Sequence, residues 1–426
     1  MGIEEPKLIY LTNGKIAVTG ERMLIFVNEN ELTEQKSEIQ DYVINSFKNK
    51  QDFNLQFRAD INTLSVTILP TMDCNLRCTY CYADGGIDPI KLNFGDIACF
   101  LNQLISKYPD CNKINLYFAG GGEPLLNFDL INEVVNYVRQ KGLIPDIKIV
   151  TNGILIQKYF DWLKENKVNL RISYDGSAQN TNRPGYNFNS NDVLIDTFKF
   201  LKKNYPPELL TVQLTVTSSN VFKMCEDVEK IILEYGIDTV KLEPVHYSFS
   251  NRSKNVSQPS PEEFTVNFLK TIDNMVSKEI KGYLDISYLS IPSTCYFCSI
   301  RNQAILSPYN LLIPCVEVIK KGLNDDVILS DDFKNINFDK ISVMQQKKLY
   351  KYHSSNFPKC SNCNLVHICK INCPMRIILF SKDKPYDYNC MMSHILIPKF
   401  LERASENEKY LHIVYGDDFN KSEKCI

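Results

Sequence analysis

The sequence predicts an α/β fold with a mainly parallel sheet, followed by a small cysteine-rich domain. Between residues 63 and 244, six apolar runs of strand length alternate with helical patterns. Strands that alternate with helices pair in parallel and place the helices outside, in an open sheet or a partial barrel. After about residue 285 the alternation ends and the chain becomes rich in loops and cysteine. Such a segment is typical of a domain that metal holds together rather than apolar burial.

In the alternating region, the periodicity of the apolar residues predicts each element. The predicted strands are residues 64–69, 113–119, 146–150, 169–173, 210–217 and 239–244. The predicted helices are residues 93–107, 127–141, 154–166, 191–204 and 221–235.

The first 60 residues have a different pattern. Three short strands are expected at 8–11, 15–19 and 23–27, and Asn13-Gly14 is a strong hairpin signal between the first two. A helix is expected next, because Leu32, Ile39, Val43 and Phe47 share one helical face. The sequence therefore predicts a small α+β segment ahead of the parallel region.

Composition limits the function classes. The chain has 426 residues, 44% of them hydrophobic, and a formal net charge of −2, so a broad surface for nucleic acid is not expected. No signal peptide and no apolar run of membrane-spanning length is visible, so a soluble cytoplasmic protein is expected. In that compartment the 15 cysteines indicate metal rather than disulfides. Isolated cysteines are expected to be incidental or buried, namely Cys99, Cys111, Cys225 and Cys425.

The first cysteine group follows the first strand of the parallel region. Cys74, Cys78 and Cys81 have the spacing C-x3-C-x2-C and lie at the strand's C-terminal end, where barrel enzymes place their active sites. Three thiolates without a nearby fourth leave one iron of a cubane open to a substrate or cofactor. A zinc knuckle is the alternative, although zinc sites usually pair two C-x2-C halves.

With Tyr80 as its aromatic residue, this motif resembles the signature of the radical S-adenosylmethionine (SAM) superfamily. Gly122 and Glu123, in the run Gly-Gly-Glu-Pro after the second strand, resemble the element that contacts the SAM amino group. Ser173, in Ser-Tyr-Asp-Gly after the fourth strand, is similar to a SAM-contacting serine, and Arg183 to an arginine that binds the SAM carboxylate. The resemblance implies a partial (β/α)6 TIM-like barrel with one [4Fe–4S] cluster and bound SAM.

These residue types suit that chemistry. Glycine lets the backbone approach a bound cofactor closely. The carboxylate of Glu123 offers a charge-assisted hydrogen bond to an ammonium group.

The later cysteines resemble the SPASM domain, an auxiliary-cluster module of radical SAM enzymes that modify peptides. Their core spacing is C-x2-C-x5-C-x3-C, and Asn310 replaces a usual glycine in the preceding turn, which asparagine tolerates in the left-handed conformation. The resemblance implies one cluster on Cys298, Cys315 and Cys373, with Cys295 as probable fourth ligand, and another on Cys360, Cys363, Cys369 and Cys390. Three [4Fe–4S] clusters are therefore expected. A zinc ribbon is the alternative, and whether Cys295 ligates stays open.

Four segments follow from these assignments. Residues 1–62 form the N-terminal module, 63–285 the barrel, 286–400 the SPASM domain and 401–426 a tail. His246 and His367, which lie near the motifs, are expected to be ordinary hydrogen-bonding residues.

The resemblance implies reductive cleavage of SAM to a 5′-deoxyadenosyl radical that abstracts hydrogen, with a flavodoxin or ferredoxin as reductant. The first hypothesis is maturation of a ribosomal precursor peptide by a thioether cross-link, or otherwise by a carbon–carbon cross-link, with residues 1–60 holding part of the leader. The second is sulfatase maturation, whose enzymes carry an aspartate directly after the cysteine that matches Cys315. Here that residue is Val316, followed by Glu317. A non-enzymatic metal scaffold would leave the SAM-binding elements unexplained. No residue is assigned as the catalytic proton acceptor.

Overall fold

The fold is that of a computed structural model. It describes residues 6–20, 23–34, 58–60, 62–246, 256–289, 305–320, 322, 325–341, 356–369, 375, 377–378 and 387–416.

A long, mainly parallel sheet forms the centre of the molecule. Its strand order is β11-β10-β9-β8-β7-β6-β5-β12-β13, and β4 pairs with β5 outside this path. From β5 to β11 all neighbouring strands run parallel. The bounds are β4 Arg58–Asp60, β5 Thr63–Ile68, β6 Lys113–Phe118, β7 Ile144–Thr151, β8 Asn169–Ser173, β9 Leu210–Val216, β10 Thr239–Pro244 and β11 Tyr283–Asp285. All six predicted strands, and the parallel partial barrel, are confirmed.

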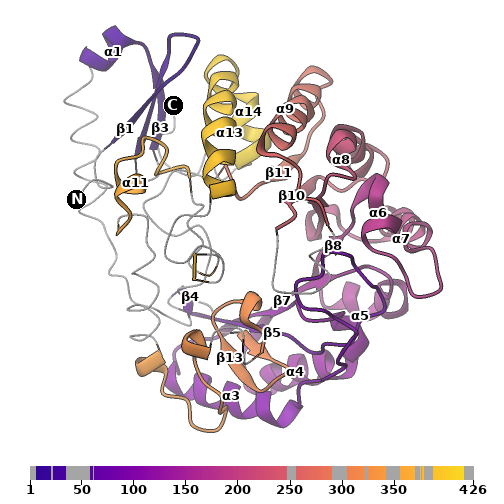
Figure 1. Cartoon of the computed structure of the whole chain (residues 1–426). Coiled ribbons are helices and arrows are strands. Elements are labelled where there is room, and N and C mark those ends of the chain that lie inside the picture. The colour runs from indigo at the N-terminus through magenta and orange to yellow at the C-terminus, as the bar shows by residue number, and fades with distance from the viewer. Residues whose placement is uncertain are drawn as a thin grey trace.

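Helices cover the outer side of this sheet, which follows an arc in Figure 1. They are α3 Phe94–Lys107, α4 Phe128–Gln140, α5 Phe160–Glu165, α6 Gln179–Asn182, α7 Ser190–Asn204, α8 Met224–Leu233 and α9 Pro261–Ser277. Helix α9 begins at a capping box of Ser260 and Glu263 and is not among the helices predicted from the sequence.

The strands show why one face meets the helices. In β9, Leu210, Val212, Leu214 and Val216 are buried in the same core cluster as residues of α7 and α8. The residues between them are only partly buried, and their side chains point to the opposite, concave face because strand side chains alternate. The core therefore lies between sheet and helices, and the concave face keeps polar side chains such as Thr215.

A separate antiparallel sheet precedes the barrel. It contains β1 Lys7–Tyr10, β2 Ile16–Gly20 and β3 Met23–Val27 in the order β1-β2-β3. The hairpin predicted at Asn13-Gly14 is confirmed, and Gly14 has φ +83°. Helix α1 (Glu29–Glu34) covers the start of the helix predicted next, whose residues Ile39, Val43 and Phe47 lie outside the described part.

The C-terminal segment begins as an extension of the barrel sheet. Strands β12 (Ile305–Ser307) and β13 (Leu311–Ile313) form a hairpin, and β12 runs parallel to β5. Asn310 in its turn has φ 57°, which confirms the expected left-handed conformation. The short helix α11 (Pro358–Ser361) follows.

Two helices end the described chain. Helix α13 (Asp387–Glu406) runs across residue 400, so the boundary predicted there falls inside a helix. Helix α14 (Lys409–Tyr415) lies within the predicted tail. Helix α13 packs on α9, where Arg403 forms an ion pair with Asp273 at Nε–Oδ1 2.8 Å.

Contacts distant in sequence join the N-terminal sheet to this C-terminal region (Figure 1). Thr12 donates from its hydroxyl to Glu402 Oε1 of α13 at 2.6 Å, and Asn13 Nδ2 donates to Ser405 Oγ at 3.0 Å. His367 Nδ1 lies 2.9 Å from the carbonyl oxygen of Thr19 in β2, which matches the ordinary hydrogen-bonding role expected for this histidine.

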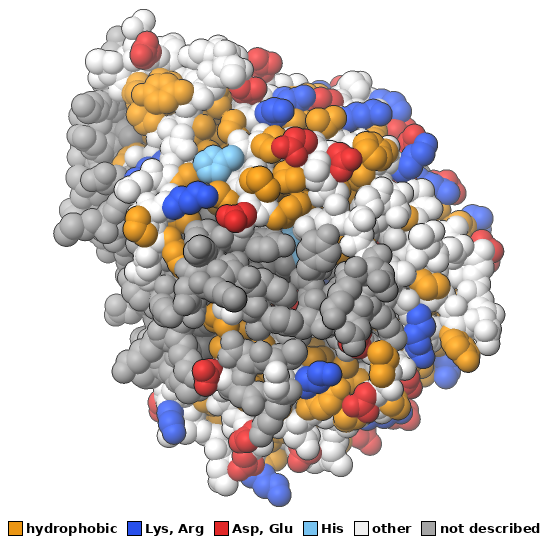
Figure 2. Space-filling view, viewed as in Figure 1, with side chains coloured by type: hydrophobic (Ala, Val, Ile, Leu, Met, Phe, Trp, Pro, Cys, Tyr) orange, Lys and Arg blue, Asp and Glu red, His pale blue; other side chains and the backbone are white. Residues whose placement is uncertain are grey.

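Among the described helices, none has the length and apolar character needed to cross a membrane. On the face shown in Figure 2, acidic and basic side chains are interspersed over the described surface.

Replacing Phe268 in α9 with alanine should destabilise the protein by about 3–5 kcal/mol, because a fully buried ring is lost from the core. Phe222→Ala is the matched control, since that ring is 62% exposed and its loss should cost no more than about 0.5 kcal/mol. Anaerobic thermal unfolding of both variants measures the difference. Equal melting temperatures would contradict the packing described above.

Candidate functional site

The loop after β5 carries the first cysteine motif and is held by the loop after β8. Arg77 N donates to Pro184 O at 2.9 Å, and Thr79 N donates to Asn182 O at 2.8 Å. The Arg77 guanidinium folds back onto its own loop and donates to Cys74 O at 2.6 Å. Two loops that lie about 100 residues apart in sequence therefore fix the backbone around the cysteines.

Cys74, Cys78 and Cys81 are free, partly exposed thiols. Burial raises the pKa of Cys74 to about 12 and that of Cys78 to about 11, and the charges of neighbouring thiolates add to both shifts. Cations bound at these thiols would favour the thiolates.

The three thiols match in number the cysteine ligands of a cubane that keeps one iron open. Within the described residues, no three His, Cys, Asp or Glu side chains are arranged to hold a single metal ion. A cubane makes a different demand, because each thiolate binds its own iron.

Gly122 packs directly against the cysteine loop. A Cβ at this position would lie 1.9 Å from the carbonyl oxygen of Asp73, so no other residue fits without moving the backbone. Gly122 N donates to Thr71 O at 2.8 Å, and Glu123 N donates to Asp73 O at 2.8 Å. The glycine expected to approach a cofactor therefore also approaches the chain's own backbone.

Glu123 is buried and connects the loop after β6 to the end of β7. Its carboxylate accepts hydrogen bonds from Thr151 Oγ1 at 2.7 Å, Asn152 N at 2.7 Å and Leu125 N at 3.1 Å. Burial raises the pKa of Glu123 to about 7, although these hydrogen bonds oppose the shift. A carboxylate has about four acceptor positions, so one stays available to a ligand.

Ser173 is the last residue of β8. Its hydroxyl makes no hydrogen bond to any of the residues that the structure describes, in contrast to its neighbours. It is thus available to a bound molecule.

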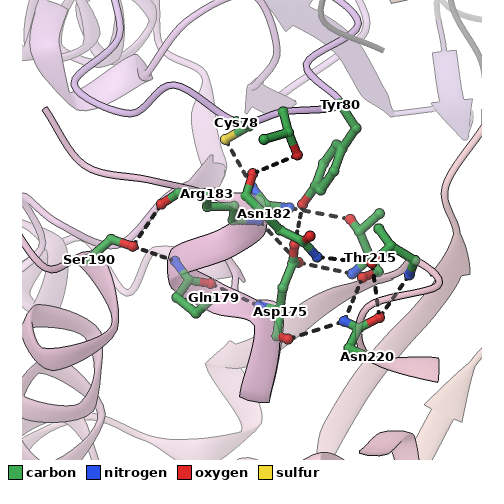
Figure 3. A network of polar contacts seen from close by, with 11 residues as sticks. Cys78, Tyr80, Asp175, Gln179, Asn182, Arg183, Ser190, Thr215 and Asn220 are labelled. Atoms are coloured by element: carbon green, nitrogen blue, oxygen red, sulfur yellow. Dashed lines mark hydrogen bonds and ion pairs between the residues drawn. The ribbon is translucent and has the colours of Figure 1, made fainter. Parts of the chain in front are cut away.

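Asp175 is the centre of a polar network that Figure 3 shows. Its side chain is fully buried. Oδ1 accepts from Arg183 Nε at 3.0 Å and from Thr215 N at 3.2 Å, and Oδ2 accepts from the Tyr80 hydroxyl at 2.5 Å. One carboxylate therefore joins the aromatic residue of the cysteine motif, the arginine and strand β9.

Arg183 lies beside the cysteine motif. Its Nη1 is 3.9 Å from Cys78 Sγ, and its guanidinium lies over the Tyr80 ring at 5.1 Å. Although burial acts to lower the pKa of Arg183, the charge of Asp175 raises it above its usual value. Nη2 also donates to Thr215 Oγ1 at 3.3 Å, so two of the five N–H groups stay free for a ligand.

Sequence reasoning missed part of this network. Asp175 lies in the quoted Ser-Tyr-Asp-Gly run but received no role. Asn220 Nδ2 donates to Asp175 O at 3.1 Å and to Thr215 O at 3.0 Å. Neither Thr215 nor Asn220 belongs to a recognisable motif, so no local signal could have identified them.

The later cysteines are only partly described. Cys315 follows β13, Cys360 lies in α11, Cys363 and Cys369 lie after α11, and Cys390 lies in α13. The predicted ligands Cys295, Cys298 and Cys373 lie outside the described residues. Burial raises the pKa of Cys363, and the charge of Cys390 adds to the shift.

Comparison with known proteins identifies the domain. Residues 68–240 match the sequence model of the radical SAM superfamily. This stretch of the chain is a radical SAM domain. It uses a [4Fe–4S] cluster and SAM, as members of that superfamily do.

The chain is similar to proteins that carry different names. A cysteine-type anaerobic sulfatase-maturating enzyme of Clostridium novyi is 26% identical over 345 residues, which are 74% of this chain and 88% of that protein. A probable GTP 3′,8-cyclase of Methanococcus aeolicus is 27% identical over 300 residues, which are 68% and 97% of the two chains.

Solved structures show the same fold. The structure of anSMEcpe with bound AdoMet has a TM-score of 0.68 at 17% identity and covers 85% of this chain and 98% of that one. Streptococcus suis SuiB bound to precursor peptide SuiA has a TM-score of 0.56 at 14% identity and covers 88% and 95%.

Asp175→Asn should weaken SAM binding by about 5- to 150-fold, corresponding to about 1–3 kcal/mol for a buried network that loses one charged acceptor. Asparagine keeps the shape but cannot accept from both Arg183 and Tyr80, so Arg183 loses its fixed orientation. Asp339→Asn is the control, because that side chain is 79% exposed. Calorimetric titration of SAM into both reconstituted variants measures the effect. Unchanged affinity in Asp175→Asn would show that the network does not position a SAM-binding group.

Proposed function

We propose that this radical SAM enzyme matures a ribosomally made precursor peptide by forming a cross-link between side chains, with a thioether as the first choice. The observation that carries the proposal is the N-terminal three-stranded sheet, which is joined through Thr12, Asn13 and Thr19 to the C-terminal region. A small free substrate would not need such a module. A long peptide would need such a module, because its leader must be held while its core enters the barrel.

The N-terminal sheet has a form that suits an extended segment. In the described part of the chain, β1 and β3 each pair only with β2, so each has an unpaired edge. A peptide can add to such an edge by main-chain hydrogen bonds. The leader of the substrate would bind there.

The barrel would hold the cofactors at the carboxyl ends of its strands. Cys74, Cys78 and Cys81 would bind the [4Fe–4S] cluster, while Glu123, Ser173 and Arg183 would bind the amino and carboxylate groups of SAM. When bound and reduced, this pair supplies a radical that abstracts hydrogen. The chain's own contribution is to fix SAM and to exclude water. Glu123 is held by its hydrogen bonds to Thr151 and Asn152 at the end of β7, and Arg183 is held by Asp175.

The residue after Cys315 supports cross-linking over sulfatase maturation. Val316 packs in an apolar cluster with Leu69 and Met72, and a Cβ on Gly120 would lie 3.4 Å from Val316 Cγ1. An apolar side chain in this position cannot accept a proton.

Sulfatase maturation is the second candidate. The similarity to the Clostridium novyi enzyme along 345 residues favours it. So does Glu317, a carboxylate whose charge adds to burial in raising the pKa of Tyr82, next to Cys81. A carbon–carbon cross-link is a variant of the first proposal.

We further propose two auxiliary [4Fe–4S] clusters. One would use Cys298, Cys315 and Cys373 with Cys295, and the other Cys360, Cys363, Cys369 and Cys390. A flavodoxin or ferredoxin would supply electrons in the cytoplasm.

Iron analysis tests the cluster count. The reconstituted chain should hold about 12 irons, since three cubanes carry four each. Replacing Cys74, Cys78 and Cys81 together with alanine should leave about eight irons and abolish SAM cleavage. Zinc in place of iron, or cleavage by the triple variant, would refute the assignment.

Mass spectrometry tests the reaction. A Cys-rich or aromatic-rich precursor peptide, if a short reading frame beside this gene encodes one, is incubated with enzyme, SAM and reductant. It should lose about 2 Da per cross-link, because two hydrogens leave for each bond formed. Prior alkylation of its cysteines should block the loss if a thioether forms. A loss that survives alkylation indicates a carbon–carbon bond. Faster conversion of a sulfatase-derived peptide to formylglycine would select the second candidate.

A further inference from the structure

A histidine from α13 lies against one of the later cysteines. His394 Nε2 is 3.8 Å from Cys363 Sγ, within the range of a hydrogen bond to sulfur. This is the one polar contact of the His394 ring among the described residues. The sequence analysis gave His394 no role, because no motif contains it.

Cys390 and His394 lie on the same side of α13. They are four residues apart, so they are neighbours on one helical face. His394 thus contacts Cys363 from the helix that also carries Cys390, another cysteine of the second predicted auxiliary cluster.

The position of the imidazole is fixed by the packing of α13. Ser393, Leu396 and Ile397, which flank His394, are buried. On the same helix, Tyr388 donates from its hydroxyl to Pro259 O at 2.8 Å. The buried side of α13 therefore anchors the segment that presents His394 to Cys363, while the ring itself is exposed to solvent.

We propose that His394 is a positioning residue that donates its Nε2–H to the Cys363 thiolate and raises the reduction potential of the auxiliary cluster held by Cys360, Cys363, Cys369 and Cys390. The inference rests on the auxiliary cluster of the proposed function. Cys363 Sγ already accepts from Leu365 N at 3.5 Å, and the imidazole adds a second donor. Hydrogen bonds to cluster sulfurs offset negative charge, which favours the reduced state.

Such a role would matter for cross-linking. Closing a bond after hydrogen abstraction releases one electron from the substrate, and a cluster that is easier to reduce accepts it more readily. His394 is exposed to solvent, so an oxidised flavodoxin or ferredoxin that docks on this side would accept that electron from the cluster.

The test is a redox titration followed by electron paramagnetic resonance. The full chain with Cys74, Cys78 and Cys81 replaced by alanine is used, so that only auxiliary clusters titrate. His394→Ala should shift the midpoint potential of one cluster to a more negative value and leave the other unchanged. His394→Gln, which keeps an N–H donor, should restore part of the shift. His412→Ala, on α14, is the control and should change neither potential.

Three results would overturn the proposal. The first is two unchanged midpoint potentials in His394→Ala. The second is loss of about four irons, which would make His394 a ligand rather than a donor. The third is absence of any auxiliary signal in the parent chain. Clusters that titrate as expected in a chain that modifies no peptide would instead refute only the peptide function.

Discussion

The buried carboxylate of Asp175 is the constraint on which the candidate site depends. It accepts hydrogen bonds from Arg183, from Tyr80 and from the backbone N–H of Thr215. It therefore joins the loop after β8, the cysteine loop and β9. A fully buried charge is tolerated only when it is paired and hydrogen-bonded, and removing one partner of such a pair typically costs about 3–5 kcal/mol. Loss of Asp175 would therefore remove the hydrogen-bond acceptor of Arg183, Tyr80 and Thr215 at the same time.

Glu123 joins two segments of the chain on the other side of the cysteine loop. It is a second buried carboxylate, and it connects the loop after β6 to the end of β7 through Thr151 and Asn152. Between these two carboxylates the cysteine loop rests on Gly122, where there is no room for a side chain. Cys74, Cys78 and Cys81 are thus positioned from both sides before any cofactor binds, which is the preorganisation that a cofactor site requires.

The N-terminal sheet and the C-terminal region form a second unit of the structure. Thr19 contacts His367, a residue between Cys363 and Cys369, while the hairpin contacts α13, which carries Cys390. The N-terminal sheet therefore contacts the two segments that carry thiols of the predicted auxiliary cluster. A peptide bound to this sheet would be linked to the cluster through those contacts. In the same region, β12 adds directly to β5 and pairs on its other edge with β13, so the strand that leads to Cys315 is part of the barrel sheet.

The sequence alone determined the six barrel strands, the hairpin at Asn13-Gly14, the left-handed turn at Asn310 and the domain's family, because periodicity, turn chemistry and motif spacing are local properties. It did not determine α9, the course of α13 across residue 400, or the additional strands β4, β11, β12 and β13 in the sheet. Nor did it identify Asn220 or His394 as neighbours of motif residues. Only the tertiary structure decided these features, because they depend on contacts between segments tens to hundreds of residues apart, and such contacts leave no pattern in the sequence around either partner.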